Sequence, residues 1–166
     1  MSKFIILLLS YSLLLSLEEP PKFIKAYGSI DFGDSKQFVS SKLKENEIYK
    51  DIDNNLYYTY LFDTRFEIEF IYGTNERKPT FLKTIQLKLN SIVHSHIISK
   101  IIESFNEKYG PSKKYYISFD GGTRDYYKWV KEDKVIHLDF DGVDIDITIN
   151  SKHFNKLSKS YIEVSV

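Results

Sequence analysis

The sequence has 166 residues, of which 42% are hydrophobic and 28% charged, and its formal net charge is zero. This length fits one domain with a substantial core, and the charge balance leaves no basic excess for binding nucleic acid. The absence of cysteine excludes disulfides, thiolate metal sites, a cysteine nucleophile and a lipid anchor on cysteine. Aromatic residues make up 16%, with 13 Tyr and 12 Phe, and these residue types favour β-strands.

Residues 1–17 carry Lys3 near their start and are almost wholly apolar after it. A short positive start followed by an apolar run of this length is typical of a secretory signal peptide, so we expect export to the periplasm or the exterior. Leu14 stands where the cleavage site needs a small residue, so an uncleaved N-terminal anchor is the alternative. Residues 18–26 are expected to be a linker that leads into a single domain over 27–166.

The next part of the chain predicts a strand, a helix and then several strands. Asp34 or Ser35 is expected to cap a helix over about 35–46, because either side chain can accept hydrogen bonds from the amides of a first helical turn. The polar stretch 46–55 is interpreted as a loop that ends in a turn. Alternating apolar and polar positions predict strands over 27–32, 56–62, 66–72 and 81–90.

Apolar residues recur at helical spacing within residues 92–111, and Gly110 and Pro111 are expected to end this second helix. Asn106 is placed on its polar side, away from the apolar stripe. The remaining strands are expected over 115–119, 124–130, 135–140, 143–149 and 161–166. Together these elements predict an α+β fold of two layers, with two helices on one face of an antiparallel sheet. Their order also fits two tandem strand–helix–strands units.

The dipeptide Asp141-Gly142 between two alternating runs predicts a hairpin with a two-residue turn. That register pairs Phe140 with Val143 and puts four polar residues on the outer face, namely His137, Asp139, Asp144 and Asp146. The three carboxylates, Asp139, Asp144 and Asp146, are candidate ligands for calcium or magnesium. Their spacing is not that of the twelve-residue calcium loop, and a flat sheet face rarely wraps a cation, so we expect a solvated acidic face instead.

Neighbouring aromatic residues on the last strands are the candidate binding residues. Tyr115, Tyr127 and Trp129 lie in runs that place aromatic side chains on both faces of their strands. One face can form the core, whereas the other would expose amphipathic rings, which are enriched in protein interfaces. No phosphate-binding loop, dinucleotide fingerprint or nucleophile elbow is present in the sequence, so we expect no cofactor and no catalytic residues.

Three local patterns together resemble a known group of domains. They are Phe32-Gly33-Asp34-Ser35 before a helix, Lys108-Tyr109-Gly110-Pro111 after the second helix, and Trp129 followed by Lys134-Val135-Ile136-His137-Leu138. In these the chain resembles small exported bacterial domains of the group that includes the β-lactamase inhibitor protein and the small outer-membrane assembly lipoprotein. The resemblance implies a helix packed on an antiparallel sheet and a binding function, and it implies no catalytic residues. The lipidated cysteine of the lipoprotein branch is missing here.

These observations favour a non-catalytic protein-binding module of the cell envelope, with the aromatic sheet face as its contact surface and a protein as its partner. One alternative is a small-molecule-binding protein or an enzyme with a pocket between helix and sheet. The other is a structural envelope protein that keeps its N-terminal segment as an anchor.

Overall fold

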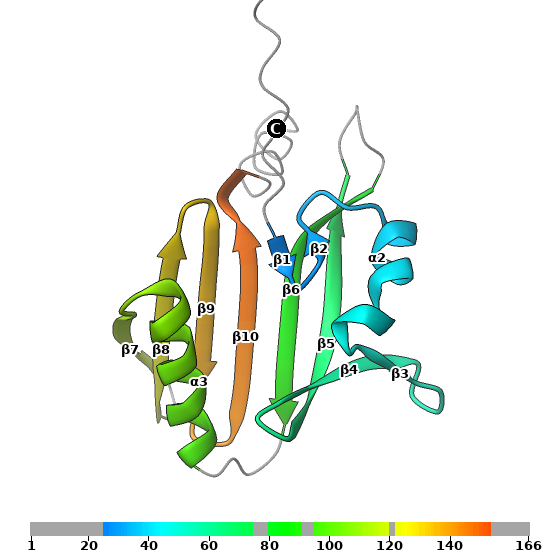
Figure 1. Ribbon diagram of the computed structural model, residues 1–166. Coiled ribbons are helices and arrows are strands. Elements are labelled where there is room, and N and C mark those ends of the chain that lie inside the picture. Colours follow the sequence, from blue (N-terminus) through cyan, green and yellow to red (C-terminus); the bar gives the residue numbers. More distant parts are fainter. Residues whose placement is uncertain (1–24, 75–79, 91–94, 120–121, 154–166) are drawn as a thin grey trace, which may run out of the picture.

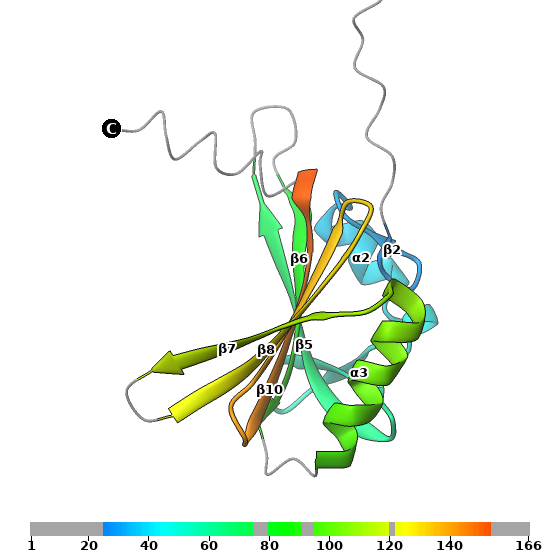
Figure 2. The same ribbon diagram turned by 90° about the vertical axis from the view of Figure 1, so that its left-hand side faces the viewer.

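The computed structural model describes residues 25–74, 80–90, 95–119 and 122–153. An eight-stranded antiparallel sheet forms one layer, and both α-helices lie on the same side of it (Figure 2). The expected α+β class with an antiparallel sheet is confirmed. The predicted segments 1–17 and 161–166 fall outside the described residues.

The elements follow each other in the order that Figure 1 shows. They are β1 (Lys25–Tyr27), β2 (Ile30–Asp31), α2 (Lys36–Lys42), the 3-10 helix η1 (Lys44–Asn46), β3 (Tyr49–Asp51), β4 (Leu56–Leu61), β5 (Thr64–Gly73), β6 (Phe81–Asn90), α3 (Ser95–Tyr109), β7 (Lys113–Phe119), β8 (Gly122–Lys131), β9 (Lys134–Phe140) and β10 (Asp144–Ser151).

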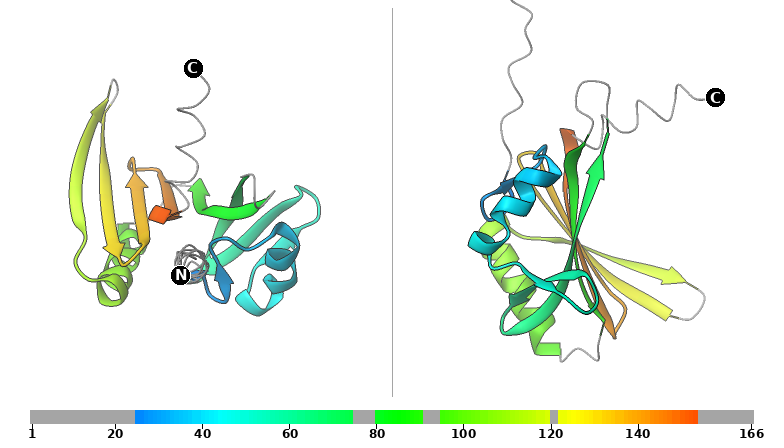
Figure 3. Two further views of the ribbon diagram at one scale, coloured as in Figure 1. Left: turned by 90° about the horizontal axis from the view of Figure 1, so that it is seen from above. Right: turned by 90° about the vertical axis from the view of Figure 1, so that its right-hand side faces the viewer.

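The sheet has the strand order β3-β4-β5-β6-β10-β9-β8-β7 (Figures 1 and 3). Sequence neighbours pair throughout except in the middle, where β6 pairs with β10. In this central ladder Leu87 lies opposite Ile147, and Leu138 of β9 flanks Ile147 on the other side. Two meandering runs of four strands therefore meet through their last strands.

Because side chains alternate across a strand, the register assigns each residue to one of two faces. The face toward the helices, called here the helix-side face, carries the core. Its buried sheet residues are Phe66, Ile68, Ile85, Leu87, Tyr127, Trp129, Ile136, Leu138, Ile145, Ile147 and Ile149. The alternation predicted for 66–72 is confirmed, since Glu67 and Glu69 are exposed on the opposite face.

Helix α3 covers β8 with an apolar stripe in which Ile101 is fully buried. Gly110 has a φ of 86°, and its amide donates to the Asn106 carbonyl, so the left-handed C-terminal cap is confirmed. The expected outward position of Asn106 is wrong. Its Oδ1 accepts hydrogen bonds from the Trp129 indole at 2.9 Å and from the Ser112 amide at 3.0 Å, because the buried indole N–H needs an acceptor.

The N-terminal part differs from the expectation in its boundaries. The predicted strand 27–32 is a small hairpin, β1–β2, and Ala26 is buried, so the ordered domain begins before residue 27. Ser35 caps α2, as one of the two expected alternatives, by accepting from the Phe38 amide. Glu47, with a φ of 55°, ends the 3-10 turn that follows α2. The stretch 46–55, which was expected to be a loop, contains β3.

Gly28 lies in the β1–β2 turn with a φ of 55°, and a β-carbon there would overlap the Asn46 side chain. Asn46 accepts from the Ser29 amide at 2.8 Å and donates to the Lys42 carbonyl at 2.7 Å. We therefore expect Gly28→Ala to lower the free energy of unfolding by about 1–3 kcal/mol, because it strains the backbone and breaks these hydrogen bonds.

Denaturant unfolding of the Gly28 variant checks this, with Gly110→Ala as its control. Gly110 also has a positive φ, but its surroundings are open, so that variant carries only the backbone cost of about 1 kcal/mol. Equal losses at the two positions would contradict the proposed role of Asn46.

The expected register of the β9–β10 hairpin is wrong by two residues. Phe140 pairs with Ile145 rather than with Val143, and Asp139 pairs with Asp146. The Asp141 carboxylate accepts from the amides of Val143 and Asp144, at 3.0 and 2.8 Å, and this local bonding favours a longer loop over a two-residue turn. A shift by two preserves the faces, although Val143 itself is exposed.

Candidate functional site

The face of the sheet that points away from the helices is called here the open face. The register places on it Tyr49, Asp51, Leu56, Tyr58, Tyr60, Arg65, Glu67, Glu69, Ile71, Gln86, Lys88, Asp144, Asp146, Thr148, His137, Asp139, Arg124, Tyr126, Lys128, Lys113, Tyr115 and Ile117. With strands about 4.8 Å apart and about 3.3 Å per residue, this face measures roughly 800 Å². Tyrosines gather near its two ends, and charged residues of both signs lie between them.

The first tyrosine cluster consists of Tyr49, Tyr58 and Tyr60 on β3 and β4. The Tyr49 and Tyr58 rings stack at a centroid distance of 5.5 Å, and Tyr60 meets Tyr58 edge to face at 5.9 Å. Arg65 lies 4.1 Å above the Tyr58 ring and forms an ion pair with Asp51 at 2.6 Å. The hydrogen bond from Arg65 lowers the pKa of Asp51 and, in return, raises the pKa of Arg65. The guanidinium thus contacts both the Tyr58 ring and the Asp51 carboxylate.

The second tyrosine cluster consists of Tyr115 and Tyr126 with His137, on β7, β8 and β9. The rings of Tyr115 and Tyr126 are 6.1 Å apart, and the Tyr126 hydroxyl forms a hydrogen bond with His137 Nδ1. Burial, followed by the nearby charge of Lys128, lowers the pKa of His137. Burial, with a smaller effect of Asp139, raises the pKa of Tyr126. Both groups are therefore held in their neutral forms near pH 7.

The three predicted metal-ligand candidates, Asp139, Asp144 and Asp146, lie on the open face of adjacent strands. The guanidinium of Arg124 pairs with Asp139 at 3.5 Å, which supplies this carboxylate with a positive partner from the protein itself. Burial first, and then Asp139 and Asp144, raise the pKa of Asp146, while Lys88 opposes the shift. Within the described ranges, no group of three or more histidine, aspartate or glutamate residues is arranged to hold a metal ion.

The structure separates the three predicted binding residues. Tyr115 is 45% exposed on the open face, whereas Tyr127 and Trp129 are 9% and 1% exposed on the helix-side face. The burial of Tyr127 and Trp129 argues against these two as candidate binding residues, because α3 covers their side of β8. The aromatic partner of Tyr115 on the open face is Tyr126, its half-buried cross-strand neighbour.

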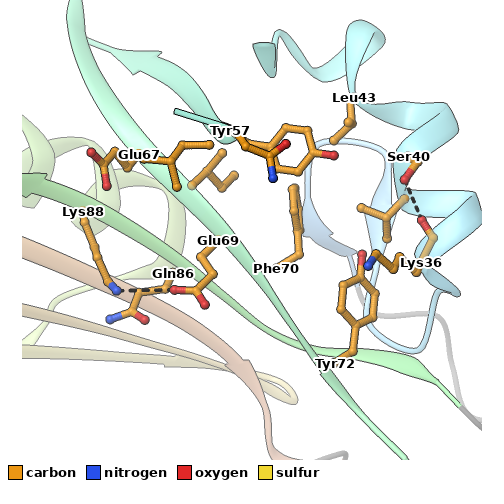
Figure 4. Close-up of a pocket in the computed structure, with 14 residues that line it drawn as sticks. Lys36, Ser40, Leu43, Tyr57, Glu67, Glu69, Phe70, Tyr72, Gln86 and Lys88 are labelled. Carbon is orange, nitrogen blue, oxygen red and sulfur yellow. Dashed lines mark hydrogen bonds and ion pairs between the residues drawn. The ribbon is translucent and has the colours of Figure 1, made fainter. Parts of the chain in front are cut away.

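A cavity of about 440 Å³ lies beside α2 and is separate from the two tyrosine clusters. Its apolar wall is formed by Val39, Leu43, Tyr57, Phe70 and Tyr72. Its polar wall is formed by Glu67, Glu69, Gln86 and Lys88, on the other side of β5 (Figure 4). Burial, with smaller effects of Tyr57 and Asp34, raises the pKa of Tyr72 to about 12, so this hydroxyl stays neutral.

Sequence reasoning missed the first tyrosine cluster. The alternation of Tyr58 and Tyr60 was visible, but Tyr49 lay in a stretch interpreted as a loop, and the apolar character of 56–62 suggested a half-buried strand. The signal that identifies the exposed face of β4 is Thr59, which is buried and lies between the two tyrosines. Its hydroxyl donates to the Glu47 carbonyl at 3.2 Å, so a polar residue could occupy the inner side.

The fold and the open face define an α+β protein whose eight-stranded antiparallel sheet has helices on one side. Comparison with protein-family models, with curated proteins and with solved structures found no match. Among the helices that the structure describes, none has the length and apolarity needed to cross a membrane.

Proposed function

We propose that this protein is a non-catalytic binding module that recognises another protein through the open face of its sheet. The observation that carries the proposal is the pair of exposed tyrosine clusters at the two ends of this face. Tyrosine and arginine are enriched where interfaces concentrate their binding energy. Five strand spacings separate β4 from β8 in the sheet order, so the clusters lie roughly 24 Å apart.

The size of the open face favours a protein over a small ligand. Its roughly 800 Å² equals the area that one partner contributes to a protein–protein interface of standard size. Mixed charges between the clusters, such as the ion pair of Lys88 with Glu69 at 3.3 Å, add polar complementarity. A small molecule would contact one cluster but could not bridge both.

Export and tandem organisation form part of the same proposal. Export rests on the apolar sequence of residues 1–17. Two tandem units are supported by the element order, since α2 precedes the meander β3–β6 and α3 precedes the meander β7–β10. This arrangement also supports the resemblance to the group of the β-lactamase inhibitor protein.

The cavity beside α2 favours the second candidate, a small-molecule-binding protein, because its volume lies in the usual range for ligand pockets.

The experiment compares three baits made from the full chain: the natural protein, Tyr60→Ala/Tyr115→Ala, and the control Phe38→Ala. Phe38 is 46% exposed like the two tyrosines, but it lies on α2, away from the open face. Proteins captured from the envelope and secreted fractions of the source cell are identified, and the affinity of each purified partner is then measured.

We expect the tyrosine variant to weaken binding by about tenfold or more, and the Phe38 variant to bind like the natural protein. Binding that survives the loss of both tyrosines would contradict the proposal. A partner weakened equally by all substitutions, or the absence of any saturable partner, would also contradict it.

A further inference from the structure

Strand β5 extends beyond the strand that flanks it. The ladder with β4 ends where Tyr57 lies opposite Ile68, whereas β5 continues to Gly73. Over residues 69–73, β5 pairs with β6 on one side and has no strand on its other side within the described residues. Figure 3 shows this edge from the right-hand side, with β4 lying against only the lower part of β5.

The hairpin geometry identifies which main-chain groups this free edge presents. Phe62 and Asp63 both have positive φ, at 52° and 60°, which defines the two-residue turn between β4 and β5. The closing pair, Leu61 and Thr64, is then a hydrogen-bonded pair, and such pairs recur at every second residue. The register of β5 with β6 shifts between Ile71 and Tyr72, but the extra residue there belongs to β6. The alternation therefore continues along β5 and directs the amides and carbonyls of Phe70 and Tyr72 toward the free edge.

The cavity beside α2 continues around this same edge. Phe70 and Tyr72 point toward α2, while Glu69 and Lys88 lie on the other side of the strand (Figure 4). One cavity can be lined from both faces of a sheet only if it passes along the side of the outer strand. It therefore occupies the path that β4 would have followed if it continued past Leu56.

We propose that the free half of β5 and the adjoining cavity bind an extended segment of a partner protein by strand addition. Main-chain groups of the segment pair with Phe70 and Tyr72, and its alternate side chains enter the two parts of the cavity. The site is separate from the tyrosine clusters, and it rests on the proposed function only in that the partner is a protein.

The walls of the cavity specify the chemistry of the segment. Residues opposite Phe70 and Tyr72 face the apolar wall with Val39 and Leu43, so they must be apolar. Residues on the other face lie beside Glu69, which pairs with Lys88 at 3.3 Å, and near Glu67, which is exposed and forms no ion pair among the described residues. A basic side chain fits there, so the segment alternates apolar and basic residues.

Binding of synthetic peptides to the full-length protein, measured by isothermal titration calorimetry, tests the proposal. The probe is acetyl-Thr-Val-Lys-Val-Lys-Val-Thr-amide, and the comparison peptide carries glutamate in place of both lysines. We expect the lysine peptide to bind about tenfold more tightly, and Glu67→Lys/Glu69→Lys to reverse this preference. The control Glu103→Lys/Glu107→Lys changes the net charge equally on exposed positions of α3 and is expected to keep the preference.

Two further versions of the lysine peptide carry N-methyl groups on alternate amides. Only one set of amides faces β5 in an added strand, so one version is expected to lose about tenfold in affinity and the other to keep it. The proposal would be overturned by an equal loss of affinity in both versions or by the absence of saturable binding. It would also be overturned if the α3 control abolished the preference for the lysine peptide as fully as the Glu67/Glu69 variant does. Tyr60→Ala/Tyr115→Ala is expected to leave peptide binding unchanged, so failure here is distinguishable from failure of the open-face proposal.

Discussion

Replacement of Trp129 by alanine is expected to lower the free energy of unfolding by about 3–5 kcal/mol. The indole is 1% exposed and meets the Phe105 ring edge to face at 5.3 Å. Its N–H donates to Asn106, so the substitution removes both the contact between α3 and β8 and the hydrogen bond that orients them. Chemical denaturation followed by far-ultraviolet circular dichroism measures the loss.

Two control variants separate packing from hydrogen bonding. Trp129→Phe keeps an aromatic ring against Phe105 but loses the N–H donor, so we expect a smaller loss of about 1–3 kcal/mol. Tyr115→Ala lies on the open face and is expected to change the unfolding free energy by no more than about 1 kcal/mol. Similar losses for Trp129→Ala and Tyr115→Ala would contradict the assignment of the two faces.

Replacement of Ile147 by alanine is expected to lower the free energy of unfolding by about 2–5 kcal/mol. Ile147 is fully buried at the centre of the sheet, opposite Leu87 of β6 and Leu138 of β9. The cavity left by truncation cannot be filled from solvent, and the strands on both sides limit collapse of the site. Thermal and denaturant unfolding of the purified variant check the expected loss.

The matched variants for this prediction are Ile147→Val and Thr148→Ala. Removal of one methyl group from Ile147 is expected to cost about 0.5–1.5 kcal/mol. Thr148 is the next residue along β10 and points to the open face, so its truncation is expected to stay within about 1 kcal/mol. A larger loss of unfolding free energy for Thr148→Ala than for Ile147→Ala would contradict the assignment of the core to the helix-side face.

Local patterns in the sequence predicted most of the fold. The run Phe66 to Tyr72 alternates apolar and charged residues, so its inner face was readable directly. The cap at Ser35 and the stop at Gly110 follow from side-chain and backbone chemistry within a few residues. The strand order was not predictable, because the pairing of β6 with β10 depends on interactions between distant parts of the chain.

The candidate site was only partly predictable, for two physical reasons. Strand β8 carries aromatic residues on both faces, so aromatic content alone could not identify its exposed face. Lys128 shares a face with Tyr126, and a charged residue there is the signal that separates this face from Trp129. The free edge of β5 could not be predicted from the sequence, because it depends on the residue at which the pairing of β4 with β5 ends.

The central ladder has a consequence for the order of folding. Thr84 and Asn150 form a hydrogen bond across β6 and β10 although they lie 66 positions apart in the chain. Closing so long a loop costs conformational entropy before any contact is gained, and contacts between distant residues slow folding. Each four-strand meander can form from local contacts alone, but β6 exposes an unpaired edge until β10 arrives. A folding intermediate with only the first meander would therefore be prone to pair with other chains along β6.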